Sequence, residues 1–180
     1  MLDLAPSSPL SHLRRAGAAA TAFAGEGVAL QEEPDLRVVL LFDKPEDPAF
    51  RRRVVRTLGG EPPVKPNTVA VGTHSIAWIA PGQWFAMGAD ADAGDGIDVS
   101  DAYCAIGLKG ARAVDLLSKS VPVEFDTKAF APHSCARTLM GPIPVFLMAR
   151  DENDFLILVE RGLAHAAWAW LVDGASSFSR

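Results

Sequence analysis

The stretch "IPVFLMARDENDFLILV", Ile143 to Val159, decides the fold. Two apolar runs, 143–149 and 155–159, flank the polar segment "RDEND". This arrangement predicts a β-hairpin, because aliphatic and aromatic residues favour strands and Asn and Asp favour turns. Neither run alternates apolar and polar residues, as a strand with one face in water should. We therefore expect helices on one face, and the rest of the chain or another protein on the other.

A second hairpin is predicted earlier in the chain. "IAWIAPGQWFAMG", Ile76 to Gly88, has two strand-like runs joined at Pro81-Gly82, a common turn dipeptide. Its two tryptophans, Trp78 and Trp84, allow two interpretations: an aromatic clamp for a flat ligand, or core residues beside a turn. When the two hairpins are aligned, Trp84 falls opposite Phe155. The alignment favours the core interpretation.

Each hairpin follows a strand and a helix, which indicates an internal pseudo-repeat. In the first block the strand is 36–42, and a helix follows with Asp47 as N-cap, Pro48 in its first turn and Gly59-Gly60 at its end. In the second block the strand is 102–110, the helix 111–120, and a final helix runs from Gly162 to about Gly174. The sequence thus predicts an α+β fold of duplicated strand-helix-hairpin units, with mainly antiparallel sheets and helices on one side.

The expected domain organisation is one α+β domain preceded by an arm. Residues 1–34 are rich in Pro, Ser, Ala and Gly and predict an extended N-terminal arm. Residues 35–180 form the domain, with pseudo-repeats at about 35–90 and 102–175. The alanine-rich segment 11–25 is too weakly apolar for a signal peptide, and no run is long enough to span a membrane. The two unclustered cysteines, Cys104 and Cys135, are typical of a reducing, cytoplasmic compartment.

Composition and charge limit the classes of partner. The 180 residues include 17 basic and 22 acidic side chains, a formal net charge of −5, without a basic tail. This balance argues against nucleic-acid binding. A hydrophobic fraction of 49% indicates either a well-filled core or a surface that a partner covers.

Two helices present candidate partner surfaces. The outward face of the helix after Asp47 carries four arginines, and is either a solvated face or a docking patch for an acidic partner. The final helix shows two apolar stripes, which are either both buried or shared with a partner subunit. The candidate interface residues are Arg52, Arg53, Arg56, His165, Trp168 and Val172.

The sequence lacks the usual catalytic and binding motifs: no GxGxxG after a strand, no P-loop and no GxSxG. The turn Gly107–Gly110 is more typical of a strand-to-helix connection than of a phosphate loop. The acidic loop 88–101 fits no EF-hand register. His74 lies beside a predicted strand, but no neighbouring residue in the sequence marks it as a catalytic base. His74 as a base, and His133 with Cys135 as a nucleophile–base pair, are the only enzymatic alternatives, and both are weak. We therefore expect no catalytic, cofactor-binding or metal-binding residues on this chain.

Three segments together resemble a known family. They are "WIAPGQW" (78–84), "AYCAIGLKGARAVDLLSKSVPVEF" (102–125) and "SCARTLMGPIPVFLMARDENDFLILVERGLAHAAWAWL" (134–171), and "SPLSHL" (8–13) adds a weaker match. They resemble the gamma subunits of heterotetrameric sarcosine oxidases, and the likeness spans nearly all of 35–175. One part of the pattern is shared more widely and also resembles the folate-binding aminomethyltransferase of the glycine cleavage system. It is the spacing of Gly110, Ala113, Leu116, Leu117 and Pro122.

The resemblance implies a function as part of a complex. It implies a non-catalytic, structural gamma subunit beside alpha, beta and delta subunits, in an enzyme that oxidatively demethylates sarcosine to glycine, with no nucleic-acid or membrane partner. It also implies that FAD, FMN, NAD, tetrahydrofolate and zinc are bound on the other subunits. The aminomethyltransferases carry an acidic pair where this chain has Val145 and Phe146, so their folate-directed acid is missing. An alternative is an autonomous binder of tetrahydrofolate or another small ligand.

Overall fold

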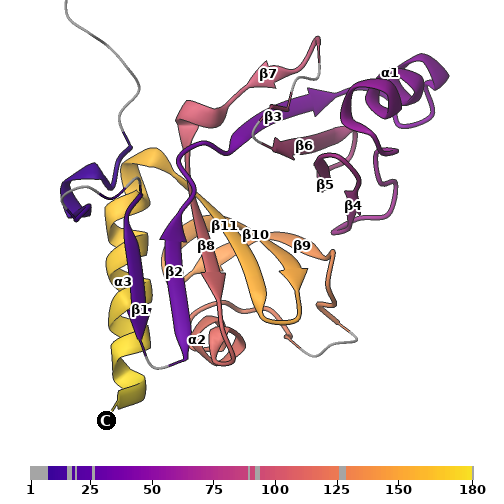
Figure 1. The fold of residues 1–180 in the computed structure, drawn as a ribbon. Coiled ribbons are helices and arrows are strands. Elements are labelled where there is room, and N and C mark those ends of the chain that lie inside the picture. Colours follow the sequence, from indigo (N-terminus) through magenta and orange to yellow (C-terminus); the bar gives the residue numbers. More distant parts are fainter. Residues whose placement is uncertain are drawn as a thin grey trace, which may run out of the picture.

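The computed structural model describes residues 8–15, 18, 20–25, 27–88, 90–91, 94–125 and 129–179. It contains two antiparallel sheets that share a core, with the long helices on their outer sides (Figure 1). In spatial order the six-stranded sheet is β1 (Ala22–Gly25), β2 (Val28–Glu32), β8 (Tyr103–Lys109), β11 (Asp154–Glu160), β10 (Ile143–Asp151) and β9 (Cys135–Met140). The five-stranded sheet is β4 (Val69–Val71), β5 (Ser75–Ala80), β6 (Gln83–Gly88), β3 (Arg37–Phe42) and β7 (Ile97–Asp98).

The described residues also form three α-helices and four short 3₁₀ turns. The α-helices are α1 (Pro48–Leu58), α2 (Ala113–Ser118) and α3 (Ala164–Ser176). The 3₁₀ turns are η1 (Ser11–Leu13), η2 (Ser100–Ala102), η3 (Arg161–Leu163) and η4 (Ser177–Ser179). None of the helices in the described ranges is long and apolar enough to cross a membrane.

The two sheets confirm the predicted duplication. The first unit runs β3, α1, β4, β5, β6 and the second runs β8, α2, β9, β10, β11. Their strands also lie in matching spatial order, β4-β5-β6-β3 and β9-β10-β11-β8. Trp84 in β6 and Phe155 in β11 both lie on the sheet face that meets the helices. One strand-helix-hairpin plan therefore builds both halves.

The continuous apolar character of β10 is explained by burial on both faces. Val145 and Leu147 belong to the core cluster that includes α2 and α3. Phe146 and Met148 belong to the cluster between the sheets, where Phe146 meets Phe85 edge-to-face with ring centroids 5.5 Å apart. The second cover that the sequence required is thus supplied by the other half of the same chain.

Helix α1 forms as its end signals predict. The Asp47 carboxylate accepts a hydrogen bond from the Ala49 amide at 2.8 Å, and Pro48 stands in the first turn. Gly59 ends the helix in a left-handed conformation with φ 76°, which costs glycine little. Phe50, Val54 and Leu58 form the buried stripe. The opposite face of the helix is consequently turned to solvent.

The structure differs from the expected N-terminal arm. Residues 22–25 and 28–32 form β1 and β2, and β2 pairs with β8. Further towards the N-terminus, Leu10 is completely buried in the core. The buried Glu32 carboxylate accepts hydrogen bonds from the Ser8 hydroxyl and from the Thr21 amide. The alternation in "VALQE" signals β2, but Glu32 at the third inward position interrupts its apolar pattern.

Candidate partner-binding surface

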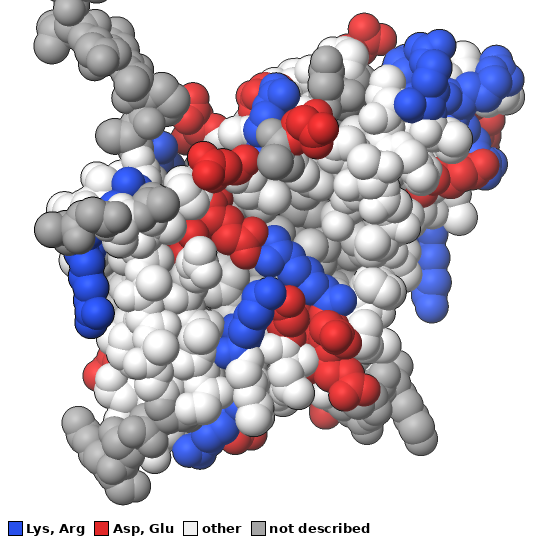
Figure 2. Space-filling view, viewed as in Figure 1, with Lys and Arg blue, Asp and Glu red and all other residues white. Residues whose placement is uncertain are grey.

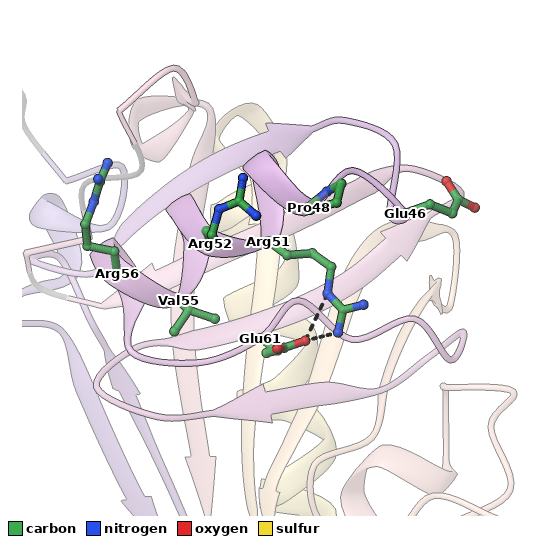
Figure 3. A pocket seen from close by; sticks show the side chains of 7 residues that line it. All are labelled: Glu46, Pro48, Arg51, Arg52, Val55, Arg56 and Glu61. Atoms are coloured by element: carbon green, nitrogen blue, oxygen red, sulfur yellow. Dashed lines mark hydrogen bonds and ion pairs between the residues drawn. The ribbon is translucent and has the colours of Figure 1, made fainter.

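The predicted arginine cluster lies on the outer side of α1. In Figure 2 Lys and Arg side chains gather over this helix, at the upper right of the molecule. Arg51, Arg52, Arg53 and Arg56 occupy four of its 11 positions. The cluster borders a hollow of about 470 Å³. Figure 3 shows its lining residues, which are Glu46, Pro48, Arg51, Arg52, Val55, Arg56 and Glu61.

Two of the four arginines are engaged by the fold itself. Arg51 donates hydrogen bonds to the Glu61 carboxylate, and this pair forms one wall of the hollow (Figure 3). Arg53 is half-buried and lies 3.6 Å from an Asp43 oxygen and 3.4 Å from an Asp95 oxygen. Its guanidinium also lies 5.4 Å from the centre of the Phe50 ring. Arg53, which the sequence placed in the candidate interface, therefore also links α1 to the segments that carry Asp43 and Asp95.

The other two arginines are exposed. Neither Arg52 nor Arg56 has an ion-pair partner within the described part of the chain. They are four positions apart, so they lie on the same side of the helix. Val55, three positions after Arg52, is 42% exposed beside them. Sequence reasoning overlooked Val55, although its position off the Phe50-Val54-Leu58 stripe indicates an outward side chain.

Helix α3 presents a different surface from the expected one. Trp168 is only 6% exposed and belongs to the core, so its assignment to a partner surface is wrong. The physical reason is that α3 buries one stripe rather than two: Ala164, Ala167, Trp168, Leu171 and Ala175. Trp170 is the exposed tryptophan, at 44%. A Cβ added at Gly141, in the β9–β10 turn, would lie 2.6 Å from the Trp170 ring. Glycine therefore allows this close packing.

The remaining α3 candidates divide between surface and core. Val172 is partly buried and packs against the core cluster. His165 is exposed, and its ring centre lies 5.2 Å from that of His12 in η1. His165 therefore lies on the surface, next to the N-terminal segment. Among the described residues it makes no contact with the α1 arginines.

The histidine and cysteine candidates do not form a nucleophile–base pair. His133 is exposed in a strained turn with φ 67°. Cys135 is fully buried, and its thiol donates to the Trp78 carbonyl oxygen at 3.2 Å. Burial raises the pKa of the Cys135 thiol to about 12, and burial followed by the charge of Glu32 raises that of Cys104 to about 12. Both groups are therefore protonated, unreactive thiols at neutral pH.

We predict that neither thiol reacts with thiol reagents in the native protein. A disulfide reagent such as dithiobis(nitrobenzoate) at pH 8 is expected to label neither cysteine until the protein unfolds, and then to label both. Rapid labelling of native Cys135 would contradict its burial. The pKa of each thiol is higher in the folded than in the unfolded protein. The contribution of the thiols to the free energy of unfolding is therefore fully present below about pH 9 and is lost as the pH rises towards 12.

The acidic loop forms ion pairs. Asp90 lies 2.9 Å from His74 Nε2, Asp95 contacts Arg53, and Asp98 lies 2.8 Å from Arg37. Hydrogen bonds to Ser100 and Arg37 lower the pKa of Asp98 to about 2. Asp92 lies outside the described residues. Across the ranges that the structure describes, no three potential ligands among His, Cys, Asp and Glu gather for a metal ion. Asp95 and Asp98 therefore have arginine partners within the fold, and Asp90 has the His74 imidazole.

Gly107 and Gly110 have structural roles. Gly107 lies within β8, and Gly110 forms the turn after it with φ 125°. A Cβ on Gly110 would lie 2.2 Å from the Gly27 carbonyl oxygen, so β2 and this turn approach as only glycine permits. The following helix, α2, has six residues and packs Ala113, Leu116 and Leu117 into the core. The connection is the strand-to-helix turn that the sequence favoured.

Two further hollows lie on the described surface. One of about 970 Å³ lies beside the segment that links β2 to β3 and is lined by five acidic and three arginine side chains: Glu32, Glu33, Asp35, Asp98, Asp101, Arg14, Arg37 and Arg161. Glu33 in this lining binds Arg150 of β10 through two hydrogen bonds of 2.6 Å. A smaller one of about 300 Å³ is lined by residues that include Phe85, Tyr103 and Leu139. The larger hollow thus carries more negative than positive groups.

Comparison with known proteins gives one consistent group of relatives. No family model matches the chain. The sarcosine oxidase subunits gamma of Corynebacterium sp. (strain U-96) and Arthrobacter sp. are each 24% identical to it, over 96% of this chain and 91% of each relative. That of Corynebacterium sp. (strain P-1) is 26% identical, over 58% of both. A chain in the solved heterotetrameric sarcosine oxidase of Corynebacterium sp. U-96, in complex with pyrrole 2-carboxylate, superposes with a TM-score of 0.82 at 24% identity.

Proposed function

We propose that this chain, a relative of the sarcosine oxidase gamma subunits in sequence and fold, is itself a gamma subunit of a heterotetrameric sarcosine oxidase. The complex oxidatively demethylates sarcosine to glycine, and this chain contributes to its assembly. One observation carries the proposal: the structural match covers 97% of this chain and 96% of the solved one. The likeness therefore extends over the whole fold rather than over one shared hairpin.

We assign the chain a structural rather than a chemical role within the complex. Val145 and Phe146, at the positions of the aminomethyltransferase acids, are buried core residues. Cys104 and Cys135 are shielded thiols of raised pKa. In this proposal FAD, FMN, NAD, tetrahydrofolate and zinc belong to the alpha, beta and delta subunits, and the complex works in the cytoplasm, where free thiols stay reduced.

Folate binding by the isolated chain is the less well supported function. The 970 Å³ hollow is the roomiest site for such a ligand, but its lining carries five carboxylates against three guanidinium groups. Folates carry a glutamate tail with two carboxylates, which this lining would repel. Several lining charges also have internal partners, such as Arg37 with Asp98. The charge balance therefore favours the assembly role.

The proposal is tested by omitting the chain from a reconstituted oxidase. The other subunits from the same organism are co-expressed with and without it, and particle mass and sarcosine-dependent hydrogen peroxide formation are measured. We expect the full-size, stable particle to form only when the chain is present. A particle of the same mass, stability and activity that forms without the chain, and does not bind it when it is added, would refute the proposal.

A further inference from the structure

We propose that Arg52, Val55 and Arg56 of α1 form an anchor for an acidic segment of a partner subunit. The inference rests on the proposed function, because it requires that the chain assembles with other subunits. It assigns the contact to one small surface, the outer side of α1 with its 470 Å³ hollow (Figure 3). We call this surface the α1 anchor.

Within the described residues, Arg52 and Arg56 lack the carboxylate partners that the other two α1 arginines have. Arg51 is paired with Glu61, and Arg53 with Asp43 and Asp95. Arg52 and Arg56 have no such carboxylate among the described residues, and both are exposed. Like charges four positions apart on a helix repel each other. Among the described residues no carboxylate offsets this repulsion, whereas a carboxylate-bearing partner would remove it.

The α1 anchor lies on the outward side of the helix. Arg52 lies two residues from Phe50 and from Val54, which places it on the side opposite the buried stripe. Val55 exposes 42% of its surface beside it, and Pro48 is exposed one turn before it. Apolar contact area thus lies beside two guanidinium groups that have no ion-pair partner among the described residues. Arginines around a small apolar centre are typical of the residues that dominate binding energy in protein interfaces.

The chemistry of the surface selects the class of partner. Guanidinium groups bind carboxylates through two parallel hydrogen bonds, and the Cβ atoms of Arg52 and Arg56 are about 5–6 Å apart on one face. The matching segment carries two carboxylates at similar spacing and an apolar side chain that contacts Val55. Glu46, which also lines the hollow, would repel a continuous polyphosphate. An acidic protein segment fits this pattern better than nucleic acid does.

The test is a charge-reversed full-length chain, Arg52→Glu with Arg56→Glu, whose binding to the other oxidase subunits is measured by interferometry. The matched control is Arg15→Glu with Arg137→Glu, which changes the net charge equally at exposed arginines elsewhere. We expect the α1 variant to bind about 100-fold or more weakly, and the control to bind within about threefold of the wild type. Wild-type binding should also weaken with salt more steeply than that of Arg52→Gln with Arg56→Gln.

The outcomes separate this inference from the proposed function. A wild-type chain that binds no other subunit overturns the proposed function and the inference with it. A wild-type chain that binds, together with an α1 variant that binds equally well, overturns the inference alone. Loss of binding to double-stranded DNA, with subunit binding unchanged, would assign the anchor to a polyanion and overturn it too. The Arg52→Glu, Arg56→Glu chain is expected to melt at the wild-type temperature, because both side chains are exposed. If it unfolds, binding by the milder Gln variant provides the same comparison.

Discussion

Replacing Trp84 by alanine is expected to lower the free energy of unfolding by about 3–5 kcal/mol. Trp84 is fully buried between β6 and α1, and its ring centre lies 5.0 Å from that of Phe50. Its indole nitrogen donates a hydrogen bond to the Pro63 carbonyl oxygen at 2.8 Å. The substitution removes the ring from the core of the first unit and leaves that oxygen without its donor. Urea denaturation followed by far-UV circular dichroism measures the change.

The matched control for Trp84 is Trp170→Ala, because Trp170 is 44% exposed. We expect the control to cost about 1 kcal/mol or less, as for a surface substitution. Equal costs for the two variants would contradict the placement of Trp84 as a core residue. A Trp84 variant with wild-type stability would restore the alternative interpretation of Trp78 and Trp84 as a ligand clamp.

Leu10→Ala is expected to lower the free energy of unfolding by about 2–5 kcal/mol, although Leu10 precedes the first strand. Its side chain is fully buried in the cluster that α3 and β8 share. The same segment is held by Ser8, which donates to the buried Glu32 carboxylate. We therefore expect a single cooperative unfolding transition at a lower denaturant concentration, rather than loss of a loose arm.

Leu13→Ala is the control for Leu10, since Leu13 lies three residues later and is 39% exposed. It should leave the transition within about 0.5 kcal/mol of the wild type. If both leucine variants unfold like the wild type, the N-terminal segment does not belong to the core. That result would favour the extended arm that composition predicts for residues 1–34.

The parts of the fold that could be predicted are those with strong local signals. Asp47-Pro48 and Gly59 mark the ends of α1, and Pro81-Gly82 marks the first hairpin turn. The doubly apolar β10 required cover on both faces, and the packing of Phe146 on Phe85 shows that the second sheet supplies it. Short edge strands gave weaker signals, because β1, β4 and β7 have two to four residues each. Their pairing depends on neighbours that are distant in sequence.

The candidate surface could be predicted in part. The arginine face of α1 follows from helical spacing, since the buried stripe fixes which side is outward. Sequence alone could not tell the engaged Arg53 from the free Arg52, because Asp43 and Asp95 approach through tertiary structure. On α3 the error came from the abundance of apolar residues: with alanine at five of its 13 positions, both candidate stripes look equally apolar. Only packing against the sheet distinguishes buried Trp168 from exposed Trp170.

The central claim is that this chain is a subunit of a heterotetrameric sarcosine oxidase, and native mass spectrometry tests it most directly. The tagged chain is purified from cells that express the remaining oxidase subunits of the same organism. The account predicts one particle that contains the 19.1 kDa chain together with the other subunits and oxidises sarcosine. Recovery of the chain alone, while an active oxidase of the other subunits assembles without it, would contradict the account.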